Sequence, residues 1–205
     1  MLKEWISAEY LKENRIINLQ NKFKKASPFS YIVLKNFFNK KKLELVLNLL
    51  IQEEFIDKNA DLFQFKQSHD IILAEVKNLK DIYSFFSSKE FCEYISKLTD
   101  TSVKSIDMSG FIYSKTDYLL PHDDQLEGRK IAYIINLSNH FKRKDGGRLQ
   151  LFSSINNQPH KILKSIIPEF NNLILFKVSS ISFHQVEEVF TNKERISLAG
   201  WFHGN

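Results

Sequence analysis

The sequence has little cysteine, proline or glycine, the residues that form disulfides, interrupt regular structure or make the backbone flexible. Its 205 residues include one cysteine, four prolines and six glycines. The single cysteine, Cys92, cannot form an internal disulfide, which fits a reducing compartment. So little proline and glycine excludes collagen-like and low-complexity chains. Any stability must therefore come from a packed core.

Long apolar runs are also lacking. Met1 is followed by LKEWISAEYLKENRIINLQ, which has no apolar segment of the kind found in a signal peptide. No stretch of about 18 apolar residues occurs anywhere in the sequence. We therefore expect a protein that is neither secreted nor membrane-spanning and that works in the cytoplasm, the nucleus or both.

Aromatic residues and lysines are plentiful. The 18 phenylalanines must be buried somewhere, which predicts one substantial core. The 29 Lys and Arg against 24 Asp and Glu give a net charge of +5, but the excess lysines are scattered through the N-terminal half without interleaved aromatic residues. This pattern favours solvated helix faces over a nucleic-acid footprint, so we expect no direct nucleic-acid binding.

Two parts with different patterns are predicted to form a single compact catalytic domain. Residues 1–100 are mainly helical, with one or two strands such as YIVLKNFF and DLFQFKQSHD, and pack on the rest. A helix is expected from Asn39, its N-cap, through KKKLELVLNLLIQEEF, and Ser87 or Ser88 is a second capping candidate. Residues 101–205 contain six short apolar or alternating runs between turn signals, which indicates an antiparallel sandwich or jelly roll.

The last run, RISLAGWFHG, separates by parity into two faces. One face is apolar and suits a covering layer of helices. The other looks functional and suits the interior of a barrel. The predicted inner face carries Arg195, Ser197, Ala199, Trp201 and, at the rim, His203.

A candidate metal site begins with HDD. His122 and Asp124 are two residues apart, so on an extended backbone their side chains leave one face. The pair alone is more typical of a solvated turn. His184, in the apolar run ISFHQV, is a third candidate ligand, although a hydrogen-bonded core histidine fits it too. Two imidazoles and one carboxylate are the set that holds Fe(II) with coordination positions open, whereas structural zinc has four ligands, usually with thiolates.

Arg195 stands 11 residues after His184, across TNKE, a plausible hairpin turn that would put both residues on adjacent strands. An arginine pointing into an apolar barrel needs an anion. A salt bridge to Asp107 or Asp117 would answer this need, and so would a bound dicarboxylate. Ser197 on the same face and Tyr113 on a facing strand are further candidates for contacting that carboxylate. No nucleotide-binding glycine motif or serine-hydrolase elbow occurs.

These residues resemble the Fe(II)- and 2-oxoglutarate-dependent dioxygenases. More narrowly, YSKTDYLLPHDDQLEGRKIAYIINL, KSIIPEFNNLILFKVSSISFHQVEEV and RISLAGWFHG are similar to the eukaryotic ribosomal prolyl hydroxylases. The resemblance implies a double-stranded β-helix (jelly roll) core covered by N-terminal helices, an α+β fold. It further implies iron on His122, Asp124 and His184, and 2-oxoglutarate with its far carboxylate on Arg195, assisted by Tyr113 and Ser197.

The implied reaction hydroxylates a prolyl residue of the decoding-centre protein of the small ribosomal subunit. It consumes O2, converts 2-oxoglutarate to succinate and CO2, and commonly uses ascorbate as reductant. Two departures from the family pattern stand out. Asn136 occupies a position where relatives commonly have a tyrosine that helps to bind 2-oxoglutarate, and relatives usually continue into a second, non-catalytic domain.

Two alternatives remain open from sequence. The same cofactors could serve another protein, a free amino acid or a nucleobase, because loops supply the substrate contacts. A non-catalytic sensor or scaffold is the other alternative, against which the presence of all three ligands and Arg195 argues.

Overall fold

The computed structural model describes residues 1–204. The helices α1 (Leu2–Trp5), α2 (Glu13–Lys25), α3 (Lys40–Leu50), α4 (Lys80–Phe86) and α5 (Lys89–Thr99) all lie in the N-terminal part. Both predicted caps are confirmed, since the Asn39 side chain accepts the Lys41 N–H at 3.1 Å and the Ser88 hydroxyl accepts the Phe91 N–H at 3.3 Å. Short 3-10 helices cover Ala8–Leu11, Ile71–Leu73 and Arg143–Asp145.

The N-terminal part contains three strands rather than one or two: β1 (Tyr31–Lys35), β2 (Phe55–Ala60) and β3 (Phe63–Asp70). The helix predicted to run through Phe55 ends at Leu50. The residues of β2 are half-buried or exposed, so they carry no alternating signal. Pairing with β3, from Phe55 opposite Ser68 to Ala60 opposite Phe63, makes this segment a strand.

Within the described residues, the regular elements of the C-terminal part are strands apart from one 3-10 turn. Its strands are β4 (Ser105–Ile106), β5 (Ser109–Tyr113), β6 (Tyr118–His122), β7 (Arg129–Asn136), β8 (Leu149–Ile155), β9 (Gln158–Ile166), β10 (Asn172–Lys177), β11 (His184–Val186) and β12 (Arg195–His203).

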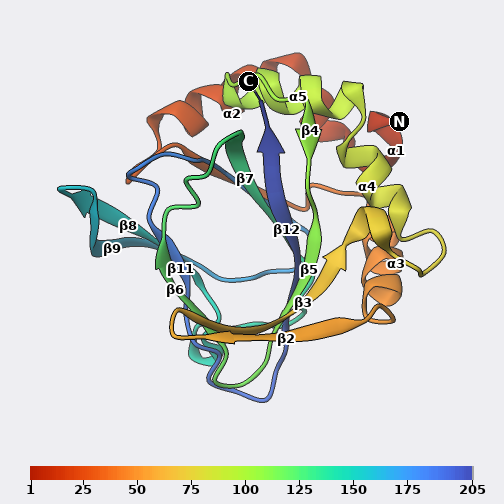
Figure 1. Cartoon of the computed structure of the whole chain (residues 1–205). Coiled ribbons are helices and arrows are strands. Elements are labelled where there is room, and N and C mark those ends of the chain that lie inside the picture. The colour runs from red at the N-terminus through yellow and green to blue at the C-terminus, as the bar shows by residue number, and fades with distance from the viewer. Residues whose placement is uncertain (205) are drawn as a thin grey trace.

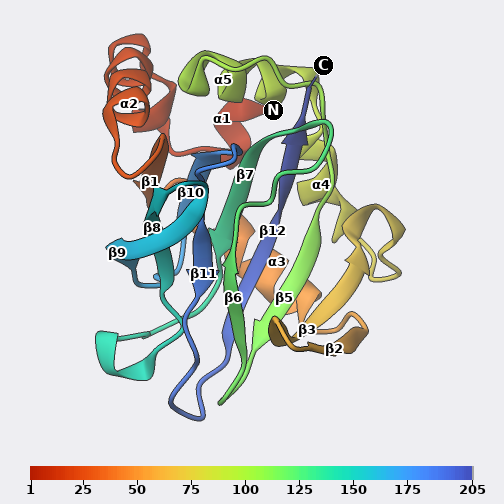
Figure 2. The same ribbon diagram turned by 60° about the vertical axis from the view of Figure 1, so that its left-hand side comes forward.

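All twelve strands form one antiparallel sheet that curls on itself. Neighbouring strands follow the order β1-β10-β7-β12-β5-β3-β6-β11-β8-β9, with β2 beside β3 and β4 beside β12. The first half of the sheet consists of β1, β10, β7, β12 and β5, and the second half consists of β6, β11, β8 and β9. The strand β3 joins the two halves, because it hydrogen-bonds to both β5 and β6 (Figures 1 and 2). The predicted jelly-roll core is confirmed, with a correction: the N-terminal part contributes strands to the barrel as well as covering it.

The two faces of the first half have different environments. Its outward side chains, such as Ile135 on β7 and Phe202 on β12, join the main apolar core with the N-terminal helices, which lie along the top and the right-hand side of the sheet in Figure 1. The inward side chains Ile134 and Phe176 pack with Leu149 of the second half. Cys92 is buried in the helical layer, as predicted for a small apolar residue. Within residues 1–204, no helix has the length and apolar character needed to cross a membrane.

Candidate metal centre

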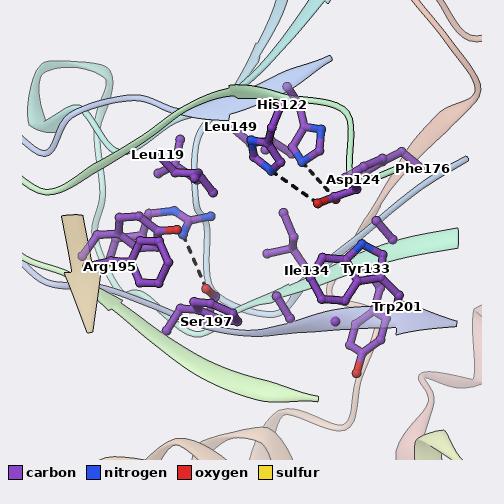
Figure 3. A pocket seen from close by; sticks show the side chains of 18 of the residues that line it. Leu119, His122, Asp124, Tyr133, Ile134, Leu149, Phe176, Arg195, Ser197 and Trp201 are labelled. Atoms are coloured by element: carbon purple, nitrogen blue, oxygen red, sulfur yellow. Dashed lines mark hydrogen bonds and ion pairs between the residues drawn. The ribbon is translucent and has the colours of Figure 1, made fainter. Parts of the chain in front are cut away.

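His122, Asp124 and His184 converge at one point inside the barrel. His122 ends β6, Asp124 follows it in a loop, and His184 begins β11 directly opposite His122 in register. The Asp124 oxygens lie 3.4 Å from His122 Nε2 and 3.3 Å from His184 Nε2, and the two imidazole centroids are 4.1 Å apart (Figure 3). One donor atom from each residue therefore lies within 4.8 Å of the others.

Backbone carbonyls orient both imidazoles. Nδ1 of His122 lies 2.9 Å from the Leu120 carbonyl oxygen, and Nδ1 of His184 lies 2.9 Å from the Ser182 carbonyl oxygen. Because a carbonyl only accepts hydrogen bonds, each Nδ1 carries a proton, and an imidazole in this tautomer has its lone pair on Nε2. Both lone pairs are thus presented to the same point, as metal ligation requires.

The protonation states also suit a metal. Burial, reinforced by the charge of His184, lowers the pKa of His122 to about 4. Burial alone would raise the pKa of Asp124, but the two neighbouring histidines outweigh it and hold that pKa at about 2. At neutral pH the site therefore offers a carboxylate and a neutral His122, the forms that bind divalent cations.

The composition of this donor set fits Fe(II). Two nitrogen ligands and one carboxylate leave coordination positions open for other ligands. Among residues 1–204, these three form the only His, Cys, Asp or Glu cluster that could hold a metal ion, so a four-ligand structural zinc site has no basis here.

A cavity of about 200 Å³ joins the metal centre to Arg195. Figure 3 shows His122 and Asp124 on one side of it, and Arg195 with Ser197 on the opposite side. Four of the five inner-face residues predicted on β12 line this cavity, namely Arg195, Ser197, Ala199 and Trp201. His203 instead points to Asp107, with Nε2 2.8 Å from its carboxylate.

Arg195 is buried without an anion. Its side chain is 2% exposed, and Nη1 lies 3.4 Å from Ser197 Oγ, while no carboxylate within residues 1–204 lies at ion-pair distance. The predicted alternative of a salt bridge is wrong: Asp107 binds His203, and Asp117 accepts the Ser114 N–H at 2.8 Å. Burial accordingly lowers the pKa of Arg195. A buried guanidinium with free donors is a site for a carboxylate from outside the chain.

The strand arrangement around Arg195 differs from the prediction in two ways. His184 and Arg195 are not on neighbouring strands of a hairpin, because β11 pairs with β6 and β8 while β12 pairs with β4, β5 and β7. Residues 187–194 cross from one half of the barrel to the other. Tyr113 is not on a facing strand but is the partner of Arg195 in register on the adjacent strand, with its ring centroid 5.0 Å from the guanidinium carbon.

Asn136 lies beside Ser197 in register and is 1% exposed, and both atoms of its amide lack hydrogen-bond partners. It is not among the cavity-lining side chains. Phe65 and Gln67 of β3 also line the cavity, and neither was predicted from the sequence. The alternating pattern of DLFQFKQSHD marked a strand, but nothing in it indicated pairing with the catalytic part.

Sequence and fold comparisons point the same way. Residues 108–203 match the model of the 2OG-Fe(II) oxygenase superfamily. The chain is 40% identical over 181 residues to prolyl 3-hydroxylase OGFOD1 of Xenopus laevis, covering 86% of this chain and 35% of that one. It is 33% identical over 219 residues to prolyl 3,4-dihydroxylase OGFOD1 of Ostreococcus tauri, covering 96% and 41%. The chain thus spans roughly a third to two fifths of the length of these relatives.

Solved structures share the fold. A prolyl-4-hydroxylase of Pseudomonas putida superposes with a TM-score of 0.72 at 15% identity, covering 91% of this chain and 99% of that one. A Trichoplax adhaerens prolyl hydroxylase in complex with a hypoxia inducible factor peptide fragment superposes with a TM-score of 0.70 at 17% identity, covering 96% of each chain. The match to the family model, which spans the convergent ligands and the buried arginine, places residues 108–203 of this chain in the 2OG-Fe(II) oxygenase superfamily.

Proposed function

We propose that this chain is an Fe(II)- and 2-oxoglutarate-dependent dioxygenase that hydroxylates a prolyl residue of a protein. The observation that carries the proposal is one cavity with a three-ligand metal centre at one side and a buried arginine without an anion at the other. A metal centre alone, or a buried arginine alone, would fit many functions. The combination suits a ligand that carries a carboxylate at one end and a metal-chelating group at the other.

Each group of residues has a distinct role in this proposal. His122, Asp124 and His184 hold Fe(II), which supplies oxygen activation with O2 and 2-oxoglutarate as cosubstrates and succinate and CO2 as products. Arg195 pairs with the far carboxylate of 2-oxoglutarate, and Ser197 adds a hydroxyl beside it. The rings of Tyr113 and Phe65 keep water from this end of the cavity. Ascorbate is the proposed reductant.

A protein substrate is supported by the names of the relatives, which are prolyl 3-hydroxylases and a prolyl 3,4-dihydroxylase. We propose the decoding-centre protein of the small ribosomal subunit as this substrate, because the sequence around the ligands resembles the ribosomal enzymes. This assignment places the enzyme in the cytoplasm, the nucleus or both.

The decisive experiment is intact-mass analysis of purified small-subunit ribosomal proteins incubated with enzyme, Fe(II), ascorbate and 2-oxoglutarate. A gain of about one oxygen on one protein, located by fragmentation to a proline, is expected with the wild type and not with His122→Ala. Hydroxylation that survives His122→Ala would refute the metal assignment. Turnover on a protein from outside the ribosome, with none on ribosomal proteins, would refute the substrate assignment alone.

Asn136 offers a separate test of the cosubstrate site. Its buried amide has no partner, and it sits next to Ser197. An amide reaches less far than the tyrosine of relatives, so we propose weaker 2-oxoglutarate binding than a tyrosine would give, or binding through a bridging water. Asn136→Tyr should lower the Kd for 2-oxoglutarate in a calorimetric titration of the Mn(II)-loaded protein. Equal affinity in the two proteins would remove this role.

A further inference from the structure

Arg129 lies next to the metal centre but is not part of the cavity wall. It begins β7, and its Nη1 lies 4.0 Å from Oδ1 of Asp124. Its guanidinium carbon lies 3.3 Å from the ring centroid of Trp201, so the two planar groups are in contact. Asp124 and Trp201 line the cavity and Arg129 does not. Arg129 thus lies outside the cavity, next to the candidate metal ligand Asp124 and against the cavity-lining ring of Trp201.

A tight loop returns the chain from Asp124 to this position. Asp124 has φ of 61° and Gly128 has φ of 84°, both in the left-handed region. The Arg129 N–H then donates to the Leu126 carbonyl at 3.2 Å, and Gly128 accepts the Gly204 N–H at 3.0 Å. The loop therefore starts at the ligand and ends at the guanidinium, with both ends fixed by backbone geometry.

Trp201, on which Arg129 rests, is itself fixed. Its backbone N–H donates to Oδ1 of Asp107 at 3.0 Å, and the other oxygen of that carboxylate lies 2.8 Å from Nε2 of His203. At the preceding residue, Gly200, an added Cβ would meet the Asp107 carbonyl oxygen at 2.1 Å, so the two backbones are packed as closely as they can be. The backbone that carries the indole ring is therefore held firmly beside the guanidinium.

We propose that Arg129 is a positioning residue for Asp124, held in place by the Trp201 ring. Asp124 has imidazole nitrogens near both of its oxygens, and rotation about its Cβ–Cγ bond would change which oxygen faces the metal. A guanidinium fixed on the Oδ1 side restricts that rotation and offsets part of the carboxylate charge. The stacked ring explains why arginine, rather than lysine, suits this place, since only a planar cation can lie flat on an indole.

This inference rests on the proposed metal site, and a binding experiment without turnover tests it. The probe is Co(II), titrated by its visible absorption into metal-free wild type and into Arg129→Met, Arg129→Lys, Lys130→Met and His184→Ala. Lys130 is the matched control because it is the next cation on β7, with its aliphatic stem near Gly204 instead of Trp201. Thermal unfolding of each metal-free protein measures any general loss of structure.

We expect Arg129→Met to bind Co(II) about 10-fold more weakly than wild type, with a changed absorption band, since loss of a group that orients a ligand typically has this effect. Arg129→Lys should fall between the two, Lys130→Met should equal wild type, and the metal-free unfolding temperatures should agree. A further variant, Trp201→Leu, should weaken binding as Arg129→Met does, and the double variant should lose little more.

Two results would overturn the proposal in distinguishable ways. If wild type binds Co(II) no better than His184→Ala, the metal site itself fails and the role of Arg129 fails with it. If wild type binds Co(II) tightly and Arg129→Met matches it in affinity and spectrum, the metal site stands and the positioning role alone is wrong. A loss of affinity that only parallels a loss of metal-free stability would also refute the positioning role.

Discussion

Replacing Arg195 with methionine should stabilise the metal-free protein or leave it unchanged while it abolishes cosubstrate binding. Arg195 is almost fully buried, its hydroxyl contact at 3.4 Å is long, and no carboxylate among residues 1–204 compensates its charge. A residue kept for structure alone would not carry this penalty. Methionine keeps the apolar stem and removes the buried charge.

The expected magnitudes have opposite signs. Removal of a buried, uncompensated charge should raise the free energy of unfolding by between zero and about 2 kcal/mol, the upper value being limited by the space that the guanidinium leaves. In the wild type, 2-oxoglutarate at 100 times its Kd should add about 2.7 kcal/mol. For a domain of this size that is a rise in unfolding temperature of roughly 5 to 10 °C, which Arg195→Met should lose completely.

The assay is thermal unfolding of the Mn(II)-loaded proteins with and without 2-oxoglutarate. Arg148→Met is the matched control, because Arg148 has what Arg195 lacks: its Nε donates to Glu187 at 2.6 Å. This control should be destabilised by roughly 1 to 3 kcal/mol, since Glu187 loses its cation, yet keep the shift with 2-oxoglutarate. The proposed role of Arg195 is refuted if Arg195→Met is less stable than wild type by more than about 1 kcal/mol or still responds to 2-oxoglutarate.

Three further predictions concern the ligand loops. Asp123→Asn should bind Mn(II) like wild type in calorimetry, because the oxygen that it retains can still accept the Gln125 N–H, which lies at 3.0 Å in the wild type. Asp124→Asn should lose Mn(II) binding. Equal losses in the two variants would contradict the assignment of Asp124 as the metal ligand. Ser182→Ala should lower the free energy of unfolding in urea by about 1 to 3 kcal/mol. The fully buried Ser182 hydroxyl lies 3.0 Å from the Asp123 carbonyl oxygen and accepts the Ser179 N–H at 2.9 Å. An unchanged urea midpoint would contradict this prediction. The metal-free protein should lose stability on acidification. Between about pH 6.5 and 4, His122 binds a proton in the unfolded chain but stays neutral in the folded protein. Below about pH 4, Asp124 is protonated in the unfolded chain but stays ionised in the folded protein down to about pH 2. His122→Gln should flatten the upper part of a plot of urea midpoint against pH, and an unaltered slope there would count against the lowered pKa.

Much of the candidate site could be predicted from the sequence by strand parity and residue chemistry. An alternating strand fixes which side chains share a face, so the inner face of β12 could be predicted from Arg195 to Trp201. The chemistry of two histidines and an aspartate then narrowed the choice of metal. The helix caps at Asn39 and Ser88 depend only on local hydrogen bonds, so they too could be predicted from the sequence.

Features that depend on contacts between distant segments could not be predicted from the sequence. The strand β2 has no apolar alternation of its own and exists because β3 lies beside it. The hairpin expected between His184 and Arg195 was wrong because the connection crosses the barrel, and a turn-like sequence does not report which strands its ends join. The contact of Arg129 with Trp201 likewise joins β7 to the far end of β12. Only the folded chain shows that a cation five residues after Asp124 returns to it.

The way the sheet closes governs how this protein must fold. Tyr31 of β1 pairs with Phe176 of β10, a separation of 176 − 31 = 145 residues, and β3 joins β5 to β6. Such non-local pairing makes folding slow, because long loops must close before the strands stabilise one another. A fragment of residues 101–205 would leave the hydrogen-bonding edges of β5, β6 and β10 bare, and bare edges recruit other chains. The segment that carries all the candidate chemistry should therefore aggregate when made alone and become soluble only with the N-terminal hundred residues in place.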